Sequence, residues 1–156
     1  MDDVFYESKL KDALRHLSVQ AEHRHFEQSC HSVAEAAAAV GADASDFVKN
    51  VGLSDPSGNV VICIVKGEDR VDKDAAARIV GVDKLKTATP ELMLEKTGYP
   101  VGGTPSFGYA ATFLVDERVM EKPYVWTGGG SSHALVKITP SDLLQANGAR
   151  VCRIRQ

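Results

Sequence analysis

The chain has 156 residues and a mass of 16.8 kDa, with 44% hydrophobic and 25% charged residues. This length is typical of one compact domain and leaves no room for a second domain of ordinary size. A net charge of −3 and a pI near 5.9 exclude the broad basic surface of a DNA-binding protein. The apolar runs are far shorter than the roughly 20 residues that span a bilayer, so no membrane segment is expected.

The N-terminus and the cysteines both favour a cytoplasmic protein. Residues 1–4 are acidic where a secretory signal is basic, and no apolar stretch follows them. The three cysteines are Cys30, Cys63 and Cys152, an odd number without a C-x-x-C spacing. We therefore expect buried thiols in a reducing compartment, and neither disulfides nor a metal site.

The first predicted elements are a helix and a short strand. Residues 5–17 place leucines on one face and basic residues on the other, which is typical of an amphipathic helix. Residues 22–28 predict a strand near a sheet edge, on which His23 and His25 share one face. Glu27 alone is weak support for a metal site there, so we expect a solvated strand face.

A capping box starts the next helix, because Ser32 and Glu35 can bond each other's backbone N–H groups. An alanine-rich run continues it to residue 40, where Gly41 provides the C-cap. Residues 46–53 then alternate as a strand that carries Lys49 on its apolar face.

A turn at residues 55–58 predicts an antiparallel hairpin between that strand and residues 60–65. The second strand is apolar on both faces and should be central in its sheet. Together with the later elements, this pattern predicts one α+β (mixed α/β) domain with a largely antiparallel or mixed central sheet of about seven strands and short helices packed around it. The later elements are helices at 72–80, 89–97 and 140–146, a helical turn at 117–120, and strands at 84–88, 112–115, 124–126, 134–138 and 150–154.

Residues 98–108, the first glycine loop, contain four glycines and two prolines in eleven residues. This composition excludes a helix or a strand interior and predicts a shaped loop that presents backbone N–H groups to a ligand. A plain connection between a helix and a strand is the alternative. Neither a dinucleotide-binding nor a Walker spacing is present. A second glycine loop spans residues 128–132.

Two side chains are candidates for chemistry. An ammonium on an inward strand face is costly unless it finds an anion, which makes Lys49 a candidate site residue; a side chain that reaches water from a strand end is the alternative. His133 follows the second glycine loop and either contacts a ligand or is a satisfied, half-buried histidine. Ser131, Ser132 and His133 lack the nucleophile elbow of a Ser-His-Asp enzyme, so we expect no such triad.

Several ordered motifs resemble the YbaK/EbsC family of aminoacyl-tRNA deacylases, which is related to the editing domain inserted in prolyl-tRNA synthetase. The matching segments are residues 31–37, 47–49, 97–108, 125–126, 128–130, 133–134 and 139–144. The similarity covers about residues 20–155, and residues 1–19 form an additional N-terminal helix of the same single domain, 1–156.

The resemblance implies a trans-acting deacylase that hydrolyses the ester of a mischarged small amino acid on tRNA, in prolyl-type editing, with water or a group of the substrate as the attacking group. It implies no cofactor and no metal. The partners it implies are the aminoacyl-tRNA acceptor end and an aminoacyl-tRNA synthetase, and neither DNA nor a membrane. It places the catalytic role on Lys49 and substrate binding on Gly102, Gly103, Thr104, Pro105, Ser106, Gly129, Gly130 and His133.

Three positions depart from the family pattern. Asn50 follows the lysine where Ser or Thr is common, Ser106 stands where a proline is common, with the proline at Pro105, and Tyr109 replaces a frequent histidine. These departures leave the amino-acid specificity open. They also motivate a second hypothesis, a catalytically silent module that binds a nucleotide or an aminoacyl ligand. A purely structural interaction protein is the least expected, because glycine loops and an inward lysine make a poor passive surface.

Overall fold

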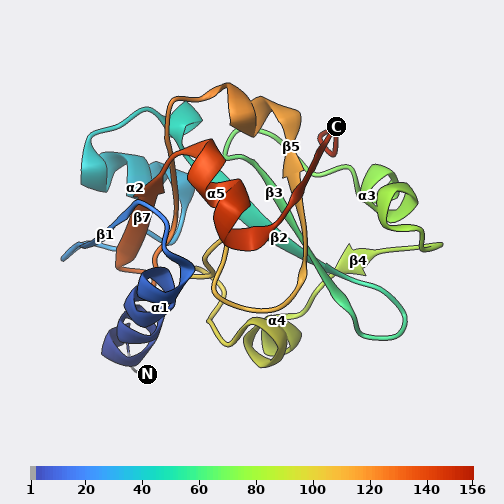
Figure 1. Cartoon of the computed structure of the whole chain (residues 1–156), viewed down its shortest axis with the longest axis horizontal. Coiled ribbons are helices and arrows are strands. Elements are labelled where there is room, and N and C mark those ends of the chain that lie inside the picture. Colours follow the sequence, from blue (N-terminus) through green and yellow to red (C-terminus); the bar gives the residue numbers. More distant parts are fainter. Residues whose placement is uncertain (1–2) are drawn as a thin grey trace.

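The computed structural model describes residues 3–156, which form eight strands in two sheets together with five α-helices (Figure 1). The predicted α+β class is confirmed. No helix of the described residues is long and apolar enough to cross a membrane. The helices are α1 (Asp3–Leu17), α2 (Val33–Val40), α3 (Lys73–Val80), α4 (Pro90–Thr97) and α5 (Pro140–Asn147).

The larger sheet has the strand order β4-β2-β3-β5-β8. The predicted hairpin pairs β2 with β3 in antiparallel fashion, and β3 is buried along its whole length, as its two apolar faces required. The strand β5 then pairs in parallel with both β3 and β8. The bounds are β2 (Val48–Ser54), β3 (Val60–Lys66), β4 (Lys86–Thr87), β5 (Thr112–Asp116) and β8 (Arg150–Cys152).

The smaller sheet consists of β1 (Ala21–His25), β7 (Ala134–Ile138) and β6 (Val125–Gly128), in that order and all antiparallel. The sequence predicted one central sheet, whereas these three strands pair with one another and form a separate layer. An isolated parallel bridge between Phe47 and Trp126 joins the edges of the two sheets. Beyond this bridge, β2 and β6 separate and line the two sides of a cavity.

Local capping rules explain where the helices begin and end. The Ser32–Glu35 capping box is present, and α4 and α5 each start with a threonine N-cap followed by proline. Left-handed glycines end α2, α3, α4 and α5. Two short 3-10 helices, Ala44–Asp46 and Glu117–Glu121, precede β2 and follow β5.

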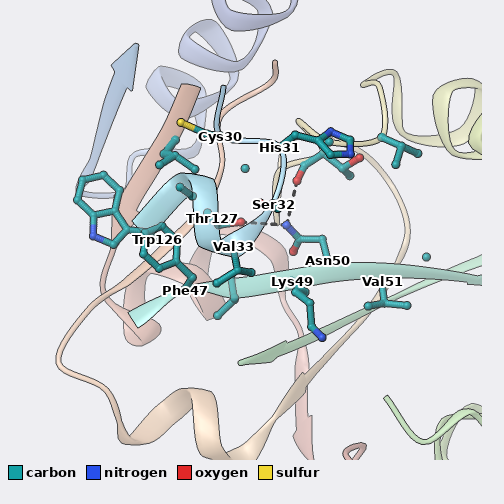
Figure 2. A pocket seen from close by; sticks show the side chains of 18 of the residues that line it. Cys30, His31, Ser32, Val33, Phe47, Lys49, Asn50, Val51, Trp126 and Thr127 are labelled. Carbon is teal, nitrogen blue, oxygen red and sulfur yellow. Dashed lines mark hydrogen bonds between the residues drawn. The ribbon is translucent and has the colours of Figure 1, made fainter. Parts of the chain in front are cut away.

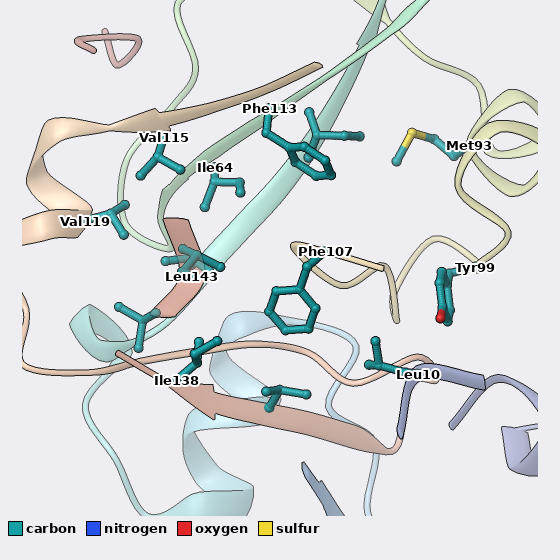
Figure 3. Close-up of a cluster of buried hydrophobic side chains, with 14 of the residues drawn as sticks. Leu10, Ile64, Met93, Tyr99, Phe107, Phe113, Val115, Val119, Ile138 and Leu143 are labelled. Carbon is teal, nitrogen blue, oxygen red and sulfur yellow. The ribbon is translucent and has the colours of Figure 1, made fainter. Parts of the chain in front are cut away.

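The main core lies between the two sheets and continues onto α5 and α1 (Figure 3). Its members include Ile64 and Ile138 from the two sheets, Leu143 from α5 and Leu10 from α1, all fully or almost fully buried. Phe107 is also fully buried in this core, although it belongs to the first glycine loop. Burial of this aromatic ring anchors the loop.

The two glycine loops pack against each other through their backbones. A Cβ atom on Gly103 would come within 2.6 Å of the Ser131 backbone, and one on Gly128 within 2.2 Å of the Thr104 carbonyl oxygen. The Gly130 N–H donates to the Gly103 carbonyl at 2.8 Å. Only glycine permits such a close approach. Contact between the two loops is therefore sufficient to explain why these positions are glycine, and no ligand is needed for that explanation.

Gly103→Ala should therefore be strongly destabilising, because its new Cβ meets backbone atoms that cannot rotate away. We expect the free energy of unfolding, measured in urea, to fall by about 2 kcal/mol or more. Gly41→Ala is the matched control: Gly41 has a φ of 68° and no atom within 4 Å of its Cβ position, so the variant should lose only the cost of a left-handed backbone, about 1 kcal/mol. Equal losses in the two variants would contradict the close contact.

Candidate functional site

A cavity of about 310 Å³ opens between β2 and β6, next to the Phe47–Trp126 bridge (Figure 2). The start of α2 covers one side, and the first glycine loop and α4 supply the other. Much of the wall is apolar or uncharged. The lining residues are Cys30, His31, Ser32, Val33, Ala36, Phe47, Val48, Lys49, Asn50, Val51, Gly52, Thr87, Ala88, Met93, Val101, Gly102, Thr104, Trp126, Thr127, Gly128 and Leu135.

Lys49 is the only lysine, arginine or carboxylate residue among the described residues that line this cavity. It is half-buried, and within residues 3–156 its ammonium makes no hydrogen bond or ion pair. Its side chain leaves β2 on the side opposite to that of Asn50 (Figure 2). The cavity wall thus carries one positive charge without a protein counter-ion, which favours an anionic group on the ligand.

A closed ring of hydrogen bonds fixes the first glycine loop to both sheets. The Asn50 side-chain nitrogen donates to Thr127 Oγ1 at 3.0 Å, the Thr127 and Ser106 hydroxyls lie 2.7 Å apart, and the Ser106 hydroxyl donates to Asn50 Oδ1 at 2.5 Å. Asn50 also donates to the Thr104 carbonyl at 2.9 Å. Ser106 and Thr127 are almost completely buried, so the ring satisfies groups that water cannot reach.

The ring explains two of the departures from the family pattern, because Asn50 and Ser106 bond each other. The third departure also supports the loop: the Tyr109 hydroxyl donates to the Pro105 carbonyl at 2.6 Å, and burial raises the pKa of this phenol. The loop amides of Gly102 and Thr104 donate to no other described residue. Both residues line the cavity, so these two N–H groups are the candidate donors of the loop to a ligand there.

Gly128 of the second glycine loop lines the cavity, and the rest of this loop lies behind it. Gly129, Gly130 and His133 do not line it; they contact β1 and α1 instead. The Gly129 carbonyl lies 2.8 Å from His23 Nε2, and His133 Nδ1 lies 3.3 Å from an Asp3 carboxylate oxygen. Substrate binding by these three residues stays a prediction. Their contacts in the structure hold the second glycine loop against β1 and α1.

A buried carboxylate holds α1 against the second glycine loop. Glu7 accepts a hydrogen bond from the Ser131 hydroxyl at 2.7 Å, and both its oxygens lie 3.0 Å from His25 Nδ1. The Ser131 hydroxyl in turn accepts from the His133 N–H at 3.1 Å. The strand face with His23 and His25, which was expected to be solvated, instead bonds the second glycine loop and the N-terminal helix, and Glu7 supports the loop from outside the cavity.

Cys30 lines the cavity, but its chemistry is that of a neutral thiol. Burial raises the pKa of this cysteine, and the nearby Glu35 adds to the effect. A thiol that stays protonated at neutral pH is a poor nucleophile. No site role was predicted for four further lining residues, Cys30, Asn50, Thr127 and Trp126. Of these, only Asn50 gives a signal in the sequence, because it is a poor strand former inside an apolar strand.

Comparison with known proteins identifies the family. The sequence model of the aminoacyl-tRNA editing domain family matches residues 27–146, so the chain belongs to this family. A crystal structure of a candidate trans-editing enzyme for prolyl tRNA synthetase is similar over 97% of both chains, with 31% identity and a TM-score of 0.89. The predicted resemblance is thus confirmed at the level of the family, while α1 and β1 precede the matched residues.

Two further relatives agree with this assignment. A crystal structure of a hypothetical protein is 27% identical, with a TM-score of 0.87, and the match covers 95% of this chain and 99% of the other. The uncharacterized protein YwhH of Bacillus subtilis (strain 168) is 25% identical over 128 residues, which is 81% of each chain. The fold is therefore shared along nearly the whole chain.

The hydrogen-bonded ring predicts strong coupling between Asn50 and Ser106. Asn50→Ala and Ser106→Ala each leave a polar partner unsatisfied, so each should lower the free energy of unfolding by roughly 1–3 kcal/mol. The double variant should lose less than the sum, by about 1 kcal/mol or more in urea unfolding. Asn50→Ala combined with Asn59→Ala, in the distant hairpin turn, is the additive control. Additive losses for the Asn50–Ser106 pair would show that the ring does not act as a unit.

His23 predicts a pH dependence of stability. Burial lowers the pKa of this histidine below its ordinary 6.5, against an opposing effect of the hydrogen bond to Gly129. The unfolded chain therefore binds the proton more readily than the folded chain. The contribution of neutral His23 to the free energy of unfolding is fully present above pH 6.5 and is lost as the pH falls through the folded-state pKa.

His23→Gln keeps a donor for the Gly129 carbonyl and removes the titration. We expect the free energy of unfolding to decline less in this variant than in the wild type between about pH 7.5 and about pH 5, in urea titrations at each pH. Parallel declines in both proteins would show that His23 does not contribute to the effect.

Proposed function

We propose that this protein is a trans-acting aminoacyl-tRNA deacylase that removes a mischarged small amino acid from tRNA, in editing of the prolyl type. The observation that carries the proposal is one cavity lined by Lys49, Gly102 and Thr104, the last two with unpaired amides, in a chain of the aminoacyl-tRNA editing domain family. The similarity to a candidate trans-editing enzyme for prolyl tRNA synthetase supports the choice of substrate.

In the proposed reaction, a water oxygen attacks the ester carbonyl carbon, and the bond from that carbon to the ribose oxygen breaks. The proton that water loses is transferred to the leaving ribose oxygen. The amides of Gly102 and Thr104 hold the negative charge that develops on the carbonyl oxygen, and Lys49 pairs with the terminal phosphate or polarises the ester.

The lining favours an attacking water over a protein nucleophile. The Cys30 thiol is protonated, and among the described lining residues no Asp or Glu is present to act as a general base. Positioning and electrostatic stabilisation then account for the rate, and these effects alone give large accelerations of acyl transfer.

The size of the cavity sets the substrate class. A volume of about 310 Å³ has to accept the acyl group next to the terminal nucleotide, so the site fits a small side chain. Discrimination between side chains that differ by one methylene stays at about 10–200-fold. The net charge of −3 leaves few contacts for the tRNA body, so we place the partner interactions at the acceptor end and with a synthetase, in the cytoplasm.

The decisive experiment is hydrolysis of tRNA charged with alanine, serine or cysteine. We expect turnover of at least one substrate by the wild type and a loss of about 100-fold or more in Lys49→Ala. Cys30→Ala, in the same cavity, is the control and should keep its activity. Thermal unfolding of each variant verifies that the fold is retained. Full activity in Lys49→Ala would remove the lysine from the mechanism.

A catalytically silent binding module is the second candidate, and the lack of a carboxylate or a reactive thiol in the described lining favours it. The same panel separates the two functions. No turnover with any charged tRNA, together with saturable binding of an aminoacyl-adenosine analogue, identifies the silent module.

A further inference from the structure

The cavity wall formed by β2 is an open strand edge. Along its other edge β2 pairs with β3 over its full length. On the cavity side, β4 pairs with Leu53 and Ser54, and the bridge to Trp126 lies at Phe47. Between these two points no described strand covers the edge, so its peptide groups face the cavity. Unpaired strand edges accept further main-chain partners readily.

Two hydrogen bonds determine which peptide groups face the cavity. Peptide groups along a strand point alternately to its two sides. The Phe47 carbonyl accepts from Gly67 N–H at 2.7 Å, on the β3 side, whereas the Gly52 carbonyl accepts from Ala88 N–H at 2.9 Å, on the opposite side. The N–H and C=O of Asn50 and the N–H of Gly52 therefore point into the cavity, and within the described residues no strand pairing or loop hydrogen bond engages them.

The charges of the cavity restrict how an amino acid is recognised there. An aminoacyl ester carries a cationic amino group, but the described lining residues include no carboxylate. A neutral oxygen must therefore accept the hydrogen bonds of the ammonium. The Asn50 side-chain oxygen already accepts from the Ser106 hydroxyl, which leaves the backbone carbonyl of the same residue as the acceptor.

We propose that the open edge of β2 is the subsite for the main-chain atoms of the aminoacyl group. The α-amino group donates to the Asn50 carbonyl. The acyl carbonyl oxygen accepts from the Gly52 N–H with one lone pair, and its other lone pair accepts from the amides of the first glycine loop. The ligand pairs with β2 as a strand one residue long. This inference rests on the proposed function and specifies how its site reads the substrate.

Close packing of Met93 explains why Gly52 is a glycine. Met93 packs over it, and a Cβ atom at this position would come within 2.1 Å of the Met93 sulfur. The residue thus keeps its N–H at the wall while the methionine closes the cavity above it. Recognition of the amino group is then independent of the side chain, and Met93 and the other apolar walls limit the side-chain size.

The test is NMR spectroscopy of the full-length, isotope-labelled protein with two probes. The first is alanine joined by an amide bond to 3′-amino-3′-deoxyadenosine, which resists hydrolysis. The second is its propionyl counterpart, which lacks only the amino group. We expect the Asn50 carbonyl carbon to shift with the alanyl probe and not with the propionyl probe. The Gly52 carbonyl, which is already bonded to Ala88, is the internal control and should stay unchanged.

Loss of a hydrogen bond to a charged group should also weaken binding of the propionyl probe by about tenfold or more. Equal affinities, with the Asn50 carbonyl unmoved, would overturn the subsite. In that case, shifts of the Gly102 and Thr104 amides would still support the proposed function. The absence of shifts anywhere in the cavity with either probe would count against both.

Discussion

The backbone contact between the two glycine loops is the constraint on which the site depends. Gly103 and Gly128 let main chains meet where any side chain would separate them. This contact sets the distance between β6 and the first glycine loop, and the ring of Asn50, Thr127 and Ser106 extends the connection to β2. From the other side, Glu7 on α1 holds Ser131 of the second glycine loop. These bonds connect β2, β6, both glycine loops and α1, and together they hold the wall of the cavity in place.

The cavity is polar mainly through its backbone. One lysine supplies the charge, and the amides of Gly102, Thr104 and Gly52 together with the Asn50 carbonyl supply most of the free donors and acceptors that we assign to the ligand. Backbone dipoles held in place need no reorganisation when charge develops, which suits a site that stabilises an oxyanion.

The two kinds of glycine in this chain illustrate how far a sequence can be interpreted. The composition of the first glycine loop correctly excluded a helix or a strand, but it could not distinguish an amide that faces a ligand from one that faces another loop. Gly102 lines the cavity, whereas Gly129 and Gly130 support it from behind. His133 has the same ambiguity, since a histidine after a glycine turn can face either a ligand or a neighbouring helix.

The sequence alone determined the capping box at Ser32 and the hairpin turn before β3, and the order of elements and motifs along the chain gave the α+β class and the family. The cap and the turn require contacts only between residues a few positions apart, so the residue types encode their geometry. Tertiary structure decided the division into two sheets, the Asn50–Ser106 pair and the open edge of β2. These depend on groups such as Asn50 and Thr104 that lie 54 positions apart and meet only after the chain has folded.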